Sequence, residues 1–327
     1  MVMDVSSIFT IQSQADFDAV ALQVYRHQYR HNLVYKEFSD YLKKTPEKIT
    51  SVQEIPFLPI EFFKSKKVVS STEKPEILFT SSGTTGTLTS THYVTDVALY
   101  EKSYLKAFTH FYGAIDTYCI LALLPSYLER QGSSLIYMAD DLIKKSNHPE
   151  SGFYLDTIEL LVQKLRELDE SNTKILLIGV SFALLDIVEK YKLNLKNVII
   201  METGGMKGRR KEMIREELHE TLKEGFGVQK IHSEYGMTEL LSQAYSKGDG
   251  IFEAPAWMDV LIRDPEDALS YQSTGKTGGV NVIDLANLNS CSFIATQDLG
   301  KKYDNNTFEI LGRFDHSDIR GCNLLVL

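Results

Sequence analysis

The sequence predicts an α/β protein: a mainly parallel sheet covered by helices, with a smaller β-rich subdomain toward the C-terminus. Between residues 96 and 232, short apolar runs alternate with stretches of helical periodicity, as in sheets whose strands are joined by helices. Beyond Glu239 the pattern changes to short β-like pieces separated by Gly, Asp and Asn. The 327 residues are 43% hydrophobic and 24% charged, which is enough apolar material for a large core.

The N-terminal part predicts a helical cap. Residues 16–42 are polar with apolar side chains at helical spacing, so we expect helices there. Residues 55–63, IPFLPIEFF, contain two prolines that forbid a regular helix and favour an extended, buried connection. On composition we divide the chain into three ranges, which are 1–76 as the cap, 77–246 as the α/β core, and 247–327 as the β-rich subdomain with a tail.

The middle and C-terminal elements follow from period and length. A first short strand is expected at 77–80 and a helix at 96–111. Further strands are expected at 118–124, 174–178, 197–201 and 230–232, with helices at 155–170, 183–191 and 209–224. The β-like pieces of the smaller, antiparallel part are 257–263, 279–285, 292–296 and 308–311.

Composition excludes several classes of protein. The formal net charge of −9 disfavours non-specific binding to nucleic acid or anionic lipid, because these carry charge of the same sign. No apolar run approaches the roughly 20 residues of a membrane span, and the N-terminus has no basic, apolar leader. The three cysteines form neither a disulfide framework nor a metal-binding spacing. We therefore expect a cytoplasmic protein.

The first candidate site is the segment FTSSGTTGTLTS at 79–90, directly after a predicted strand. Glycines let backbone N–H groups approach an anion, and hydroxyls donate further hydrogen bonds, so this composition suits phosphate. It is not the common ATP-binding loop GxxxxGK[ST], because no lysine follows the second glycine. A surface turn is the alternative. The candidate phosphate-binding residues are Ser81, Ser82, Gly83, Thr84, Thr85 and Gly86.

A second candidate is the pentapeptide YGMTE, which follows the predicted strand at 230–232. Tyr235 can stack on a base, Gly236 permits a tight backbone, Thr238 can bind phosphate, and Glu239 can hold Mg²⁺ against phosphate oxygens. Read alone, the segment could equally be a helix start with Thr238 as its cap.

Three further candidates also follow apolar runs. Gly204 and Gly205, in ETGGM, could admit an adenine at the carboxyl end of a strand, where open parallel sheets bind ligands; a simple turn is the alternative. The carboxylate of Asp298 could accept hydrogen bonds from ribose hydroxyls, although alone it is a turn aspartate. Arg313 could bind phosphate or ribose, although an exposed arginine is normally only solvated.

Taken together in this order, the segments FTSSGTTGTLTS, GG, YGMTE, TQDLG and GRFD resemble the core motifs of the adenylate-forming superfamily, the acyl-CoA synthetase and luciferase-like enzymes. The resemblance implies the large body of such an enzyme, with ATP and Mg²⁺ as cofactors. It implies phosphates at Ser81 to Gly86, adenine at Gly204, Gly205 and Tyr235, α-phosphate at Thr238, Mg²⁺ at Glu239, and ribose at Asp298 and Arg313.

Within that superfamily the sequence most resembles the acyl-protein synthetases of bacterial bioluminescence, with phenylacetate-CoA ligases as next relatives. The segments IPFLPIEFFKS, LPSYLERQGSSLIYMADDLI and GRFDHSDIRGC carry this resemblance. It implies that the mobile C-terminal lid domain of acyl-CoA synthetases is absent, and that Cys322 accepts the acyl group as a thioester. Without the resemblance, Cys322 would be interpreted as a small apolar residue of a terminal strand.

The expected enzyme is therefore an acid–thiol ligase that converts ATP to AMP and pyrophosphate, with Cys322, Thr238 and Glu239 as catalytic residues. The acid is fatty or aromatic, with a fatty acid favoured by the resemblance, and a reductase would receive the acyl group. One alternative is a ligase that transfers the acyl group to coenzyme A or to a carrier protein. Another is an inactive nucleotide-binding subunit.

Overall fold

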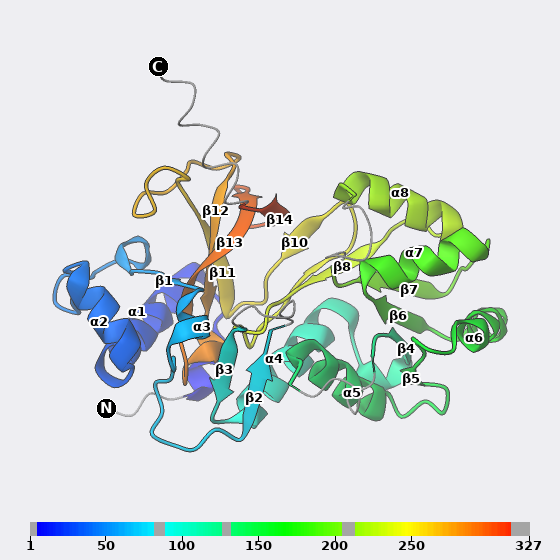
Figure 1. Ribbon diagram of the computed structural model, residues 1–327, viewed down its shortest axis with the longest axis horizontal. Helices are drawn as coiled ribbons and strands as arrows, with labels where there is room; N and C mark the ends of the chain where they lie inside the picture. The colour runs from blue at the N-terminus through cyan, green and yellow to red at the C-terminus, as the bar shows by residue number, and fades with distance from the viewer. Residues whose placement is uncertain (1–4, 82–88, 126–131, 205–212, 315–327) are drawn as a thin grey trace. The chain divides into compact units, whose positions relative to one another are not determined.

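The computed structural model describes residues 5–81, 89–125, 132–204 and 213–314, and Figure 1 shows its elements. The chain forms two compact units. One is continuous and runs from Pro75 to Pro255. The other combines Met1–Lys74 with Ala256–Leu327, so it draws on both ends of the chain.

The continuous unit is built on a mostly parallel sheet, as the sequence predicts. Its strand order is β5-β4-β6-β7-β8-β9-β10. The first five of these are parallel to their neighbours, and β9 and β10 are antiparallel additions. In chain order the bounds are β4 Cys119–Leu123, β5 Gly152–Phe153, β6 Ile175–Gly179, β7 Val198–Glu202, β8 His232–Tyr235, β9 Ala244–Ser246 and β10 Ile251–Glu253.

Helices cover both faces of this sheet. In Figure 1, α7 and α8 lie on one face and α4 and α5 on the other. Every residue of β4 and β6 is buried, which explains why these strands read as unbroken apolar runs. In the described ranges no helix is both long and apolar enough to cross a membrane. The helices of this unit are α4 Val97–Tyr112, α5 Ser134–Ser146, α6 Ile158–Glu170, α7 Ser181–Lys190 and α8 Arg215–Phe226, with a 3-10 turn η3 at Ile115–Thr117.

Several elements of this unit were not predicted. A hairpin pairs β2, Ile77–Thr80, with β3, Thr91–Val94, so the predicted phosphate-binding segment is a hairpin loop. Helix α5 was missed although its signals are present, since the Ser133 side chain accepts a hydrogen bond from the N–H of Ile136 and caps it.

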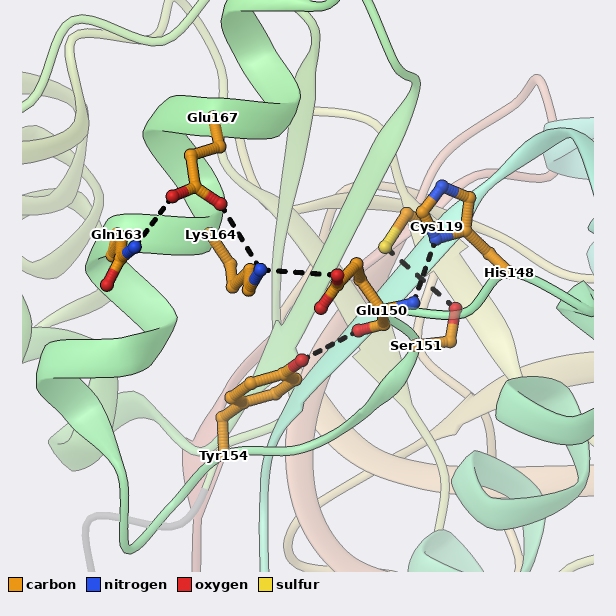
Figure 2. A network of polar contacts seen from close by, with 8 residues as sticks. All are labelled: Cys119, His148, Glu150, Ser151, Tyr154, Gln163, Lys164 and Glu167. Atoms are coloured by element: carbon orange, nitrogen blue, oxygen red, sulfur yellow. Dashed lines mark hydrogen bonds and ion pairs between the residues drawn. The ribbon is translucent and has the colours of Figure 1, made fainter.

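A network at the amino end of β4 fixes the segment that leads to β5 (Figure 2). Ser151 Oγ lies 3.9 Å from Cys119 Sγ and accepts a 2.9 Å hydrogen bond from the N–H of Ile120. Lys164 of α6 contacts both Glu150 and Glu167 at 3.2 Å. These contacts lie at the amino end of β4, whereas the candidate site residues follow the carboxyl ends of the parallel strands. We therefore assign these contacts a structural role.

The second unit contains an antiparallel sheet packed with helices from the N-terminus. Strands β11 to β14 are consecutive and antiparallel, and β1 runs parallel to β13. Gln28 of α1 donates hydrogen bonds to the carbonyl oxygens of Asn287 and Leu288, at 3.0 and 2.9 Å. The bounds are α1 Gln14–His31, α2 Leu33–Tyr41, β1 Leu58–Pro59, α3 Phe62–Ser65, β11 Met258–Arg263, β12 Gly278–Asp284, β13 Phe293–Lys302 and β14 Phe308–Arg313, with 3-10 turns η1 Val5–Thr10, η2 Val52–Glu54 and η4 Leu285–Asn287.

Candidate functional site

The base of the β2–β3 hairpin is closed by reciprocal serine contacts. The N–H of Ser81 donates to the carbonyl oxygen of Ser90 at 3.1 Å, and the N–H of Ser90 donates to Ser81 Oγ at 2.9 Å. Ser81 therefore organises the point where the predicted phosphate-binding loop leaves the strands. The other predicted loop residues, Ser82, Gly83, Thr84, Thr85 and Gly86, lie outside the described residues.

A neighbouring segment is tied to the same hairpin. The N–H of Thr80 donates to the carbonyl oxygen of Gly132 at 2.7 Å. Gly132 has φ of +82°, and a Cβ on it would lie 3.0 Å from Thr80 Oγ1, so both the backbone and the close approach favour glycine. Gly132 itself, the residue before the α5 cap Ser133, thus lies against the edge of the hairpin.

His92 of β3 connects the hairpin to the pentapeptide YGMTE. Its Nδ1 lies 2.9 Å from the carbonyl oxygen of Thr238, and the side chain is 1% exposed. Because a carbonyl oxygen only accepts hydrogen bonds, Nδ1 carries the proton and donates. The structure thus brings together two segments that the sequence singled out separately.

The pentapeptide itself begins at the carboxyl end of β8. Tyr235 is the last residue of this strand, is 8% exposed, and meets the Phe252 ring edge-on with 6.0 Å between centroids. A Cβ on Gly236 would lie 2.4 Å from Glu234 Oε1, so a larger residue there would have to displace the Glu234 carboxylate. Thr238 is half-buried and the Glu239 side chain is buried.

The described residues offer no cluster of three or more His, Cys, Asp or Glu side chains that could hold a metal ion by themselves. Mg²⁺ bound with a nucleotide needs only one or two carboxylates, because phosphate oxygens and water complete its shell. Glu239, next to Thr238 at the end of β8, is compatible with that arrangement.

A buried carboxylate holds the predicted adenine turn at the end of β7. Glu202 Oε2 accepts hydrogen bonds from the N–H of Gly204 at 2.7 Å and from Ser181 Oγ at 3.1 Å. His219 Nε2 lies 3.7 Å from Glu202 Oε1, which is an electrostatic contact rather than a hydrogen bond. Gly204 has φ of +70°, and no described atom lies within 4 Å of the position of a Cβ. Gly205 lies outside the described residues.

Two neighbouring carboxyl groups have opposite pKa shifts. Burial alone would raise the pKa of Glu202, but His219, Arg215 and the N–H of Gly204 favour its ionised form and lower the pKa to about 2. Burial, aided by the negative charge of Glu202, raises the pKa of Glu234 to about 8. At neutral pH, Glu202 is therefore ionised and Glu234 is protonated.

In the other unit, the two predicted ribose-binding residues lie side by side. Asp298 of β13 and Arg313 of β14 are direct partners across the two strands. Arg313 Nε donates to Asp298 Oδ1 at 3.0 Å. The Asp298 side chain is 7% exposed and that of Arg313 is 47% exposed, so this ion pair has a buried acceptor and an open cationic edge.

The two described cysteines are poorly suited to act as nucleophiles. Both are fully buried, and burial raises the pKa of Cys119 to about 11 and that of Cys291 to about 12. Both are therefore protonated thiols at neutral pH. Cys322, the predicted acyl acceptor, lies outside the described residues.

Sequence reasoning missed the roles of His92 and Glu202. Glu202 had a readable signal, because it is a charged residue at the end of an apolar strand and directly precedes the glycines. His92 had none, since one histidine in the short strand THYV does not identify a contact with a segment 146 residues away.

Comparisons with known proteins identify the family and the fold. The family model described as "Acyl-protein synthetase, LuxE" matches residues 8–327. A curated relative, the long-chain-fatty-acid–luciferin-component ligase of Photorhabdus luminescens, is 35% identical over 68 residues, which are 20% of this chain and 58% of the relative. This chain thus matches less than two thirds of that protein's length.

Solved structures of similar fold are adenylate-forming ligases. A 2-hydroxyisobutyryl-CoA ligase in complex with 2-HIB-AMP and CoA has a TM-score of 0.69 at 13% identity, covering 94% of this chain and 77% of that one. ATP-bound MatB from Rhodopseudomonas palustris has a TM-score of 0.52 at 16% identity, covering 72% and 47%. At these identities the likeness establishes the fold, and the family match extends over nearly all of the sequence. The chain therefore belongs to the acyl-protein synthetase (LuxE) family.

Proposed function

We propose that this protein uses Mg·ATP to activate a carboxylic acid, in the first instance a fatty acid, as acyl-AMP, and then transfers the acyl group to the thiol of Cys322. A reductase would take the acyl group from Cys322. Family membership supports the general reaction class, and the relative from Photorhabdus luminescens is a long-chain-fatty-acid ligase by name.

In the first half-reaction, a carboxylate oxygen attacks the α-phosphorus of ATP and the bond from that phosphorus to the bridging oxygen breaks. Pyrophosphate leaves and acyl-AMP remains. We assign the α-phosphate to Thr238 and Mg²⁺ to Glu239, where the ion would neutralise phosphate charge. Asp298 and Arg313 would bind the ribose hydroxyls. The protein contributes mainly positioning and charge neutralisation.

In the second half-reaction, the Cys322 thiol loses its proton to solvent or a nearby base, and the thiolate attacks the acyl carbonyl. A carbon–sulfur bond forms, the bond from the acyl carbon to the phosphate oxygen breaks, and AMP leaves. The high pKa values of Cys119 and Cys291 support the choice of Cys322 among the three cysteines.

The observation that carries the proposal is the contact between His92 and Thr238. A hairpin whose loop suits phosphate and a pentapeptide that suits α-phosphate and Mg²⁺ are joined by one buried hydrogen bond of 2.9 Å. Unrelated surface turns would not need this connection.

The test is intact mass after incubation with ATP, Mg²⁺ and a mixture of fatty and aromatic acids. We expect a covalent adduct whose added mass identifies the acid, and its loss in Cys322→Ser. Acid-dependent exchange of pyrophosphate into ATP should persist in Cys322→Ser and be abolished in Glu239→Ala. Exchange that survives Glu239→Ala together with Gly83→Val would refute the nucleotide site.

The second candidate is transfer to coenzyme A or to a carrier protein, with Cys322 uninvolved. The similar fold of a ligase solved with CoA makes this the alternative to separate. Normal stoichiometric consumption of CoA by Cys322→Ser would establish it in place of the thioester on the protein. ATP binding without any acid-dependent release of pyrophosphate would instead indicate an inactive nucleotide-binding subunit.

A further inference from the structure

We infer that Glu202 is a positioning residue that fixes the Gly204 turn in the shape required to receive the nucleobase. Both ends of the Gly204 peptide unit are held. Its N–H donates to Glu202 Oε2 at 2.7 Å, and its carbonyl oxygen accepts from the N–H of Ser181 at 3.0 Å. Ser181 Oγ donates to the same Glu202 oxygen at 3.1 Å, which closes the arrangement.

Among the described residues, none crowds the remaining side of Gly204. Gly204 adopts φ of +70°, and no described atom lies within 4 Å of the position that a Cβ would take. The backbone hydrogen-bonding groups of Gly204 are already used, so a ligand there would contact its Cα face. A flat aromatic surface such as a purine ring suits a flat, rigid backbone edge of this kind.

The chemistry of Glu202 favours a functional role over simple support of the fold. Removing an ionised carboxylate from water is costly, and apolar residues of similar volume often replace buried charges without loss of stability. The two hydrogen bonds of Glu202 Oε2 go to the turn and to Ser181, the first residue of α7. His219, 3.7 Å from the other oxygen, helps to keep the carboxylate charged.

This inference rests on the proposed function, because it takes adenine as the ligand of the Gly204 turn. Glu202 would act through Gly204 and would not touch the nucleotide. A turn held in place before binding reduces the entropy lost when the base is bound. Removing Glu202 should therefore weaken recognition of the base more than it slows the chemical step.

The experiment compares Glu202→Met, which removes both oxygens at similar volume, with Glu202→Gln, which keeps one acceptor oxygen. Acid-dependent pyrophosphate release is measured with ATP and with GTP. We expect Glu202→Met to raise the KM for ATP about tenfold or more, to change kcat by less than about threefold, and to reduce the preference for ATP over GTP. Glu202→Gln should give intermediate values.

The matched control is His219→Gln, which leaves both Oε2 contacts in place and should lower thermal stability while keeping the preference for ATP. If His219→Gln loses this preference as fully as Glu202→Met, general packing is responsible and the inference fails. It fails equally if folded Glu202 variants keep the wild-type KM and nucleotide preference.

Should Glu202→Met fail to fold, Glu202→Gln decides the question together with hydrogen exchange at the Gly204 amide. Faster exchange there with an unchanged ATP preference would overturn the inference. A wild-type protein that does not distinguish ATP from GTP would instead refute the assignment of adenine, which belongs to the proposed function.

Discussion

His92 Nδ1 lies 2.9 Å from the carbonyl oxygen of Thr238, although 146 residues separate the two in the sequence. One end of this hydrogen bond is on the strand that follows the hairpin loop, and the other is the residue before Glu239. A shift at either end would alter the distance between two groups that we assign to the same triphosphate.

Replacing His92 should therefore impair the use of ATP. The size of the effect should depend on whether the new side chain places a hydrogen-bond donor near the Thr238 carbonyl oxygen. His92→Asn puts an amide N–H close to the position of Nδ1, and His92→Gln reaches instead toward the position of Nε2. We expect His92→Ala and His92→Gln to lower kcat/KM for ATP about tenfold or more, because the Thr238 carbonyl loses its partner, and His92→Asn to recover most of it.

Pyrophosphate exchange kinetics provide the measurement, and the exposed His110, changed to Asn, provides the control. Equal activity of the Asn and Gln variants would show that the donor position is irrelevant.

Arg313 should matter for nucleotide binding and little for stability. Its side chain is 47% exposed, and ion pairs of this kind contribute about 1 kcal/mol or less to stability. Arg313→Lys removes the Nε–H that donates to Asp298, so we expect the KM for ATP to rise about tenfold with a nearly unchanged melting temperature.

An ion pair that involves the neighbouring strand β13 provides the control for Arg313. Lys302 lies 2.6 Å from Asp259, and Lys302→Gln should leave the KM for ATP unchanged. A similar rise in KM in both variants would mean that a general disturbance of this sheet, and not loss of the Arg313 donor, is responsible.

Stability should fall as pH rises through the range in which Glu234 titrates. The pKa of Glu234 is raised from 4.5 to about 8 in the folded protein, so the unfolded chain loses this proton first as pH increases. The stabilisation of the folded protein by protonated Glu234 is complete below about pH 4.5 and is lost by about pH 8. We expect Glu234→Gln to be more stable than wild type by several kcal/mol at pH 8 and by about 1 kcal/mol or less at pH 5.

Denaturant unfolding at several pH values measures this difference, with the exposed Glu253, changed to Gln, as the matched control. If the free energies of unfolding of wild type and Glu234→Gln change in parallel between pH 5 and 8, the raised pKa of Glu234 is contradicted.

Alkylation should distinguish the cysteines. The buried thiols of Cys119 and Cys291 should react with maleimide more than about 100-fold more slowly than a free thiol at pH 7.5, because they are inaccessible and protonated. Under the proposed function Cys322 reacts first. Peptide mass mapping measures the order, and urea should make the three rates similar. Rapid labelling of Cys291 in the folded protein would conflict with its burial.

Much of the fold could be predicted because strands buried on both faces read as continuous apolar runs. The predicted strands at 174–178 and 197–201 are β6 and β7 to within one residue, and the predicted helix at 96–111 is α4 shifted by one. The predicted strand at 230–232 ends where β8 begins, because β8, HSEY, has three consecutive polar residues and so lacks the apolar run of a buried strand.

The order of the motifs identified most candidate residues, but not the contacts that position them. Asp298 and Arg313 were chosen separately, and only the register of β13 and β14 pairs them. Helix α5 was not predicted, although Ser133 caps it. Contacts between segments far apart in sequence depend on tertiary packing and leave no local pattern.

The opposite ionisation of Glu202 and Glu234 has a consequence for the approach of a polyanion. These residues lie on adjacent strands, yet at neutral pH they carry one negative charge and not two. Under the proposed function, less electrostatic work is then needed to bring a triphosphate toward the carboxyl edge of the sheet. In alkaline solution the second charge appears, and the same strands would begin to repel the substrate.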